Sequence, residues 1–403
     1  MVLPLSEIRV VEITRGIAGP YCGMALADMG AEVLKVERPK TEPYRNDQFW
    51  KAAKFVAYNR NKKSIAVNLE SEDGRMLMAR LLKTADVFIE NLPPGVIDGM
   101  GFSYKSASKL NQKIVYCSIK CYLPGPYGNR DVEDTILESQ AGFPQCIGEE
   151  EPAQPLTIKS PPLKLGVPIA SLGAGEYAAL ATVGALLKRM KTGQGEHIIV
   201  GAFEAAFNLL APSTYSLNKE KRKHSAINYR LKDGEWLQGS YQHIGSSRRF
   251  DRWKVFCNIF GVGKEDYEAT STVEKRDAMG SQAMRKIISK YVSQFTLEEA
   301  RKMIVDNNII AGVVVTMREV LDNDQLKTKL IPLVVAPEVG MTPQPTTVSH
   351  MMLPMRSKDY NPKATGNWTP APKLGQHTAK ILRDLGYTEN QIKDLTMRGI
   401  IWP

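Results

Sequence analysis

Hydrophobic positions in residues 1–120 follow two alternating patterns. Short apolar runs typical of buried strands occur at residues 8–13, 31–37, 64–69, 86–90 and 113–119. Helical spacing occurs between them, at residues 19–30 and 72–82; Pro20 lies in the first turn of the earlier helix and Gly30 at its end. Apolar strands that alternate with helices predict a doubly wound, mostly parallel α/β sheet with helices on both faces.

The pattern changes after residue 120. Residues 125–168 are rich in Pro, Gly and Glu without clear periodicity, which is typical of functional loops. A helix at 174–189 is rich in small residues and is expected to pack closely on another element. Further elements are expected as a strand at 197–200, a helix around 203–210, helices at 277–291 and 296–305, a strand at 333–336 and a helix at 378–385. Residues 225–325 are interpreted as a smaller second domain.

Composition excludes several classes of protein. The 403 residues are 43% hydrophobic and 24% charged, which is typical of a soluble globular protein with a sizeable core. No apolar run approaches the roughly 20 residues of a membrane helix, and residues 1–8 lack the features of a signal peptide. Five cysteines without a CxxC pair, and scattered histidines, favour a reducing cytoplasm and no metal site. We therefore expect a cytoplasmic protein without membrane attachment.

Charge alone does not identify a ligand. The net charge of +10 fits an anionic ligand and equally fits a protein that is merely basic. The basic run Lys219–His224 is interpreted as a solvated linker, so no nucleic-acid partner is expected. The strand-to-helix turn at Gly16–Pro20 could present backbone N–H groups to an anion or be only a tight turn. It is not GxGxxG, and the chain has no GxxxxGK[ST] loop.

Seven motifs spread along the chain resemble the family III CoA-transferases, the carnitine- and formyl-CoA-transferase group. They lie at residues 17–39, 59–65, 86–95, 114–118, 166–175, 191–197 and 374–386. The resemblance implies a Rossmann-like large domain formed by residues 1–220 and 330–403, with a smaller α+β domain inserted at 221–329. It also implies an interlocked dimer with active sites at domain and subunit interfaces.

The same resemblance implies that coenzyme A lies along the first strands, as part of an acyl-CoA substrate. The matching positions for its adenine and diphosphate are Ile17, Ala18, Arg38, Val67, Leu69, Asn91, Leu92 and Met100. The guanidinium of Arg38 suits a phosphate, because it can form bidentate charged hydrogen bonds. The alternative is that Arg38 is a surface charge beside Pro39.

Ser171 departs from the family, whose members carry an Asp nucleophile at this position. The resemblance implies that this Asp attacks the acyl-CoA thioester and later holds CoA as an aspartyl thioester. A serine could form only an O-acyl ester and would need a general base, whereas Asp ionises without help. Asp134 and Glu176 are the candidate substitutes, Asp134 a weak one and Glu176 more typical of a helix surface.

Two further positions differ from relatives. Glu133 stands where relatives tend to have Tyr, and Gly99 stands where some relatives place an Arg. The loop at residues 130–134 also lacks the His-Asp pair that the racemase branch uses for proton transfer. These changes favour natural divergence over a deliberate replacement of the Asp by Ser171.

Three functions stay open from the sequence. The first is a non-catalytic subunit of a hetero-oligomeric CoA-transferase, in which a homologous catalytic subunit supplies the Asp. Such a complex would move CoA from an acyl-CoA such as succinyl-CoA to a carboxylic acid. In this respect the chain resembles the Asp-lacking subunit of succinyl-CoA:(R)-benzylsuccinate CoA-transferases. The second is an active homodimeric transferase, hydrolase or racemase that uses another residue, and the third is a CoA-binding protein without chemistry.

Overall fold

The computed structural model describes residues 3–39, 45, 49–145, 164–210, 226–240, 246–247, 250–251, 253–357, 360–361 and 368–402. The chain divides into two compact units. The first comprises Met1–Ile147, Leu163–Ala211 and Thr328–Pro403, and the second comprises Gly148–Pro162 and Pro212–Lys327. The basic run at 219–224 and Cys146 lie outside the described residues.

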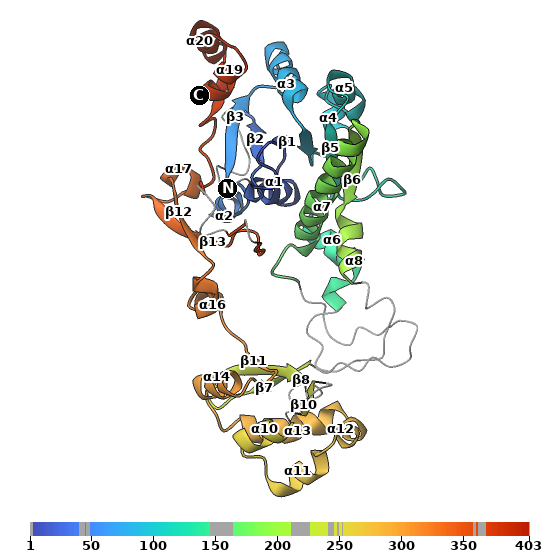
Figure 1. Ribbon diagram of the computed structural model, residues 1–403, viewed down its shortest axis with the longest axis vertical. Helices are drawn as coiled ribbons and strands as arrows, with labels where there is room; N and C mark the ends of the chain where they lie inside the picture. Colours follow the sequence, from blue (N-terminus) through green and yellow to red (C-terminus); the bar gives the residue numbers. More distant parts are fainter. Residues whose placement is uncertain are drawn as a thin grey trace. The chain divides into compact units, whose positions relative to one another are not determined.

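A seven-stranded sheet forms the centre of the first unit, in the order β14-β3-β2-β1-β4-β5-β6 (Figure 1). Its strands are β1 Arg9–Ile13, β2 Glu32–Glu37, β3 Lys62–Val67, β4 Val87–Glu90, β5 Val115–Lys120, β6 Glu196–Gly201 and β14 Ile401–Trp402. Strands β1 to β6 are parallel, and β14 is antiparallel to β3. The prediction of a mixed α/β protein with a mainly parallel sheet is confirmed.

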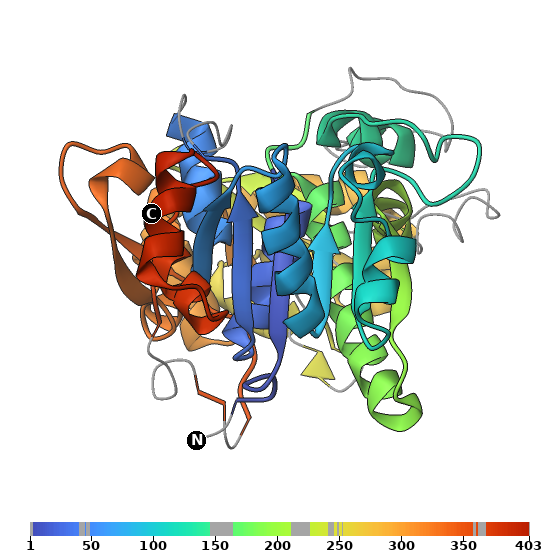
Figure 2. The same cartoon turned by 90° about the horizontal axis from the view of Figure 1, so that it is seen from above.

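Helices cover both faces of this sheet, as Figure 2 shows from above. One core contains α1 (Ala18–Asp28), α7 (Ile169–Thr192) and α8 (Ala202–Leu209). The opposite core contains α3 (Glu72–Thr84), α5 (Tyr104–Leu110), α19 (Thr378–Asp384) and α20 (Glu389–Met397). Successive strand residues enter opposite cores, for example Val10 and Val11, because side chains alternate along a strand.

The other elements of the first unit are shorter. They are α2 (Phe49–Tyr58), α4 (Val96–Gly99), α6 (Asp134–Ala141), a 3-10 turn (Phe143–Gln145), β12 (Ile331–Val335), α17 (Pro337–Gly340) and β13 (Thr346–His350). Strands β12 and β13 form an antiparallel pair. Helix α6 lies in the segment expected to be loop only, and α7 begins at Ile169, earlier than the expected residue 174.

The second unit is small and mostly helical. It contains β7 (Ala226–Arg230), β8 (Trp236–Ser240), β9 (Ser246–Ser247), β10 (Phe250–Asp251), α10 (Trp253–Ile259), α11 (Lys264–Thr270), α12 (Val273–Met279), α13 (Ser281–Val292), α14 (Leu297–Asp306), β11 (Gly312–Val313), α15 (Met317–Leu321) and α16 (Asp324–Lys327). Its core includes Trp253 and Phe256, whose rings stack. The single helix expected at 277–291 is divided into α12 and α13 at Gly280.

Helix α7 is the one described helix that is long and apolar enough to cross a membrane. Its buried residues include Ala174, Ala178 and Leu186, which belong to the core shared with α1 and the sheet. A core helix of this kind passes the same test of length and composition as a membrane helix. Packing within the first unit therefore accounts for the apolar residues on the buried face of α7.

The close contact between α7 and α1 depends on Gly175. A Cβ atom at Gly175 would lie 2.7 Å from the carbonyl oxygen of Ala18, whereas a Cβ atom at Gly184 would meet nothing within 4 Å. The expected packing of this small-residue helix against another element is thus observed at α1.

We predict opposite effects for two alanine substitutions on α7. Gly175→Ala should lower the free energy of unfolding by about 1–3 kcal/mol, because the backbone of α1 would have to move. Gly184→Ala should leave stability unchanged or raise it by about 0.5–1 kcal/mol, because alanine favours the helix. Denaturant unfolding of both variants measures the change in the free energy of unfolding. Equal effects would contradict the proposed contact.

Candidate active site

The candidate site lies where the strand order reverses. Strands β1 and β4 are neighbours in the sheet. From β1 the chain continues to β2 and β3 on one side, and from β4 it continues to β5 and β6 on the other side. In open α/β sheets, ligands bind outside the carboxyl ends of the strands at such a switch point. Two cavities are found here, lined by the loops that follow β1 and β4.

The first cavity has a volume of about 850 Å³ and lies at the ends of β1, β2, β3 and β4. Five of the residues predicted to bind CoA line it: Arg38, Val67, Leu69, Leu92 and Met100. The apolar side chains among them offer a surface for a flat ring, and Arg38 is exposed beside them. The cavity therefore combines an apolar wall with a cation, as a nucleotide requires.

The second cavity has a volume of about 760 Å³ and adjoins the first, because Arg15 and Leu92 line both. The remaining predicted CoA residues line it, namely Ile17, Ala18 and Asn91, together with Asp134 and Ser171. The structure thus brings all eight predicted residues around two adjoining cavities, and the predicted nucleophile position lies in the second.

Glu176 lies apart from these residues. It is exposed on α7 and is not among the residues that line either cavity. Burial of the Tyr21 ring, and then the negative charge of Glu176, raise the pKa of Tyr21 to about 12. A role as nucleophile in these cavities finds no support in this position.

Ser171 lies in the first turn of α7. Two carboxylates of α6 accept hydrogen bonds from the backbone of this turn. The backbone N–H of Ser171 donates to Asp134 Oδ1 at 2.7 Å, and that of Ile169 donates to Glu138 Oε1 at 2.8 Å. The N-cap residue Pro168 makes no capping hydrogen bond with its side chain. The carboxylates satisfy free N–H groups and place negative charge at the positive end of the helix.

Asp134 and Glu138 lie one helical turn apart on α6, and both accept hydrogen bonds from the backbone of α7. Burial, and then the neighbouring Asp134, raise the pKa of Glu138 to about 7. Asp134 Oδ2 is buried and has no hydrogen-bond partner among the described residues, unless Glu138 is protonated and donates to Asp134. Asp134 Oδ1 is thus engaged with the backbone of α7, while the residue still lines the second cavity.

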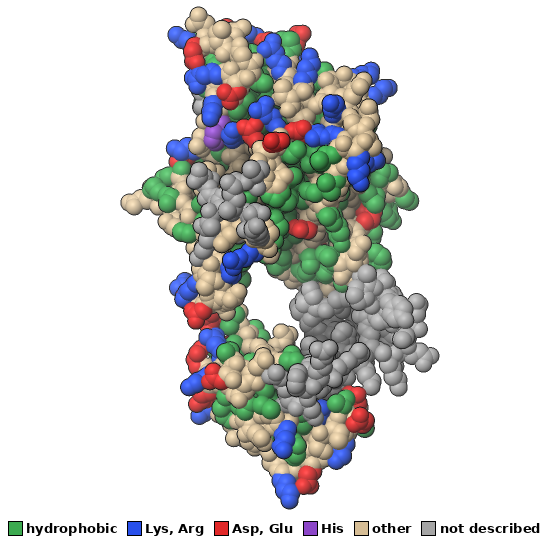
Figure 3. All heavy atoms as spheres, viewed as in Figure 1, with side chains coloured by type: hydrophobic (Ala, Val, Ile, Leu, Met, Phe, Trp, Pro, Cys, Tyr) green, Lys and Arg blue, Asp and Glu red, His purple; other side chains and the backbone are tan. Residues whose placement is uncertain are grey.

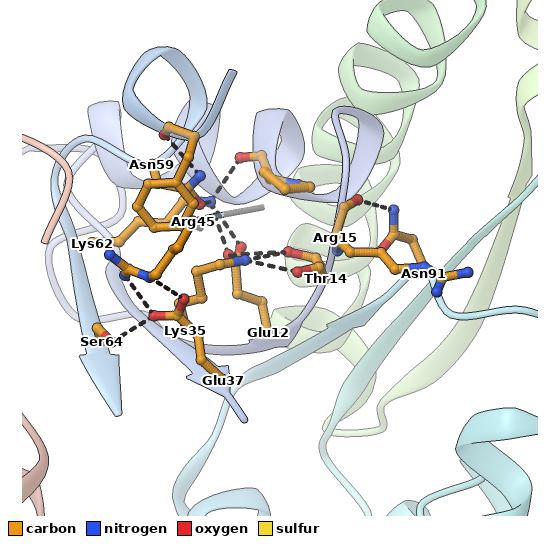
Figure 4. A network of polar contacts seen from close by, with 12 residues as sticks. Glu12, Thr14, Arg15, Lys35, Glu37, Arg45, Asn59, Lys62, Ser64 and Asn91 are labelled. Atoms are coloured by element: carbon orange, nitrogen blue, oxygen red, sulfur yellow. Dashed lines mark hydrogen bonds and ion pairs between the residues drawn. The ribbon is translucent and has the colours of Figure 1, made fainter. Parts of the chain in front are cut away.

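The loop after β1 is fixed by a second set of polar contacts (Figure 4). The backbone N–H of Arg15 donates to Asn91 Oδ1 at 2.8 Å, and Asn91 Nδ2 donates to the carbonyl oxygen of Arg15 at 2.7 Å. Lys35 Nζ donates to the carbonyl oxygen of Thr14 at 2.8 Å. The loops that line both cavities are therefore joined to each other and to β2.

Lys35 belongs to a buried cluster around Glu12. Lys62 Nζ donates to Glu12 Oε1 at 2.9 Å, to Asn59 Oδ1 at 3.0 Å and to the carbonyl oxygen of Pro20 at 2.8 Å. Lys35 Nζ lies 3.3 Å from Glu12 Oε1. Burial lowers the pKa of Lys62 to about 8, although Glu12 opposes this shift. The cluster links three strands and the first turn of α1.

Several residues of these cavities have no distinct signal in the sequence. Arg15, Lys120, Glu138 and Trp402 line them, and none was predicted. Glu138 could have been found from its spacing, since it lies one helical turn after Asp134. Among the described residues, no group of three or more His, Cys, Asp or Glu side chains could hold a metal ion.

The fold and cavities define a doubly wound α/β protein with a nucleotide-sized site at its switch point. The chain belongs to CoA-transferase family III, whose model matches residues 5–378. Succinate–glutarate CoA-transferase of Agrobacterium fabrum is 28% identical, over 95% of this chain and 96% of that protein. Formyl-CoA:oxalate CoA-transferase of Rhodopseudomonas palustris is 24% identical, over 100% of this chain and 98% of that protein.

A solved structure is also similar. The crystal structure of a CAIB/BAIF family protein from Brucella suis has a TM-score of 0.78 and 27% identity, covering 96% of this chain and 100% of that chain. The sequence resemblance to family III is therefore confirmed along the chain.

We predict that Glu138→Gln changes how stability depends on pH. The folded state holds the proton of Glu138 more tightly than the unfolded state, since its pKa rises from 4.5 to about 7. The stability gained from this proton is complete below pH 4.5 and is lost as pH rises through 7. Glutamine cannot ionise, so the variant should gain about 1–3 kcal/mol over the parent chain between pH 5 and pH 8.

Thermal unfolding across this pH range checks the prediction. The matched control is Glu133→Gln, because Glu133 is exposed and lies beside the same helix. Its profile should follow that of the parent chain. Parallel profiles for all three proteins would rule out the raised pKa of Glu138.

Proposed function

We propose that this chain is the non-catalytic subunit of a hetero-oligomeric CoA-transferase, in which a homologous subunit supplies the nucleophilic Asp. The complex would move CoA from an acyl-CoA such as succinyl-CoA to a carboxylic acid. Relatives named as succinate–glutarate and formyl-CoA:oxalate CoA-transferases support CoA transfer as the general reaction. We place the complex in the cytoplasm, without a metal.

The observation that carries this proposal is Ser171. It lines the second cavity at the start of α7, the position that matches the family's Asp. A serine hydroxyl has no acyl carbon that could be converted into a CoA thioester, so the second half of the reaction cannot pass through it. The carboxylates nearest to Ser171 are engaged with the backbone of α7.

The substrate would follow the two cavities. The adenine and diphosphate of CoA fit the first cavity, beside Arg38, and the pantetheine arm would pass Ile17, Ala18 and Asn91 into the second. The basic surplus of the chain suits a ligand with several phosphate charges.

A partner chain is supported by an apolar surface on α7 and α8. Exposed side chains there include Met190 at 81% and Leu180 at 67%, together with Leu187, Phe207 and Leu209. Figure 3 shows hydrophobic side chains gathered over this part of the first unit. Large exposed apolar patches mark protein interfaces. We propose that the catalytic subunit covers this surface in an interlocked dimer, with residues 221–329 as the inserted domain.

We predict that the purified chain alone does not transfer CoA from succinyl-CoA to any of several dicarboxylates. Turnover should appear when it is co-expressed with a homologous chain that carries the Asp, measured by chromatography of the acyl-CoA products. Transfer by the chain alone would contradict the proposal and favour an active homodimer. CoA binding without transfer in any combination would favour a binding protein.

A second variant pair tests whether the chain lacks only the nucleophile. Ser171→Asp should form a CoA adduct on this residue when succinyl-CoA is added, detected by intact mass. Ser171→Asn has nearly the same shape without the charge and should form none. An adduct on unmodified chain would show that another residue reacts.

A further inference from the structure

Trp402 is a large aromatic residue on the wall of the first cavity. Its neighbour on β14, Ile401, is fully buried and fills the core shared with α3, α19 and α20. Side chains alternate along a strand, so Trp402 points away from that core. It is 41% exposed and lines the cavity.

The position of Trp402 is held by the backbone around it. Strand β14 pairs with β3, with Trp402 opposite Ala66. The carbonyl oxygen of Trp402 lies so close to Gly375 that a Cβ atom there would collide with it. Gly375 has a φ of +68°, which favours glycine. The indole is therefore presented from a fixed strand and not from a loose end of the chain.

The chemistry around Trp402 suits a purine. Val67, Leu69 and Met100 give the cavity apolar surface, and Arg38 supplies a cation at its edge. Aromatic rings stack on nucleobases through their π faces, and a purine offers such a face. The same cavity can therefore bind a phosphate at the guanidinium of Arg38 and a base on the indole of Trp402.

We propose that Trp402 stacks on the adenine ring of bound coenzyme A and sets the affinity of the first cavity for the nucleotide end of the ligand. The proposal rests on the proposed function, since it assumes that CoA binds here. It gives β14 a role in binding adenine. None of the eight residues expected from the sequence to bind CoA lies on this strand.

The test is calorimetric titration of the full chain with three ligands: CoA, the adenosine bisphosphate portion of CoA, and phosphopantetheine. Trp402→Ala should weaken CoA and adenosine bisphosphate roughly 5- to 100-fold, the range expected for the loss of one base stack. Phosphopantetheine should bind as it does to the parent chain. Trp402→Phe should keep most of the affinity, and Trp402→Leu, which restores apolar bulk without a π face, should not.

Trp236→Ala is the matched control, because Trp236 is 39% exposed on β8 of the second unit and is absent from the residues that line the cavity. It should leave all three affinities unchanged. If Trp402→Ala and Trp402→Leu are folded, by circular dichroism, and bind adenosine bisphosphate like the parent chain, the stacking proposal is overturned while CoA binding stands. If the parent chain binds none of the three ligands, the CoA site fails, and the stacking proposal with it.

Discussion

The carboxylate of Glu12 is buried with two lysines, and both cavities depend on this arrangement. Burying three charged groups is costly unless each is paired and hydrogen-bonded. Lys62 donates hydrogen bonds to Glu12, Asn59 and a carbonyl oxygen of α1, and Lys35 donates hydrogen bonds to Glu12 and Thr14. Because these partners lie on three strands and a helix, the loop after β1 has one low-energy position, and this loop lines both cavities.

The environment of Ser171 shows that the start of α7 does not depend on the side chain at position 171. In this chain α7 is held by Asp134 and Glu138 through backbone N–H groups, and those contacts do not involve the side chain at position 171. The residue at this position can therefore differ without loss of the contacts that hold the start of the helix.

The parallel sheet was predictable because its strands are continuous apolar runs separated by periodic helices. Helix α6 was missed because its polar residues do not all face solvent: Asp134 and Glu138 contact the backbone of α7. The usual alternation of an apolar and a polar helix face is therefore weak in its sequence. Strand β14 has only two residues, and its pairing with β3 is set by packing of distant segments. The eight CoA positions followed from family resemblance. The spacing from Asp134 offers a local signal for Glu138, whereas Trp402 depends on the pairing of segments far apart in sequence, which no local pattern records.

The pairing of β14 with β3 also bears on how the protein is made. Residues 62–67 are synthesised early, but their outer edge gains its partners only after residues 377–378 and then 401–402 have left the ribosome. During that interval the nascent chain carries an unpaired, apolar strand edge, which is a template for aggregation. Pairing of such distant segments also slows folding. Yield in a host cell should therefore depend more on chaperone capacity and growth temperature than on the stability of the finished protein.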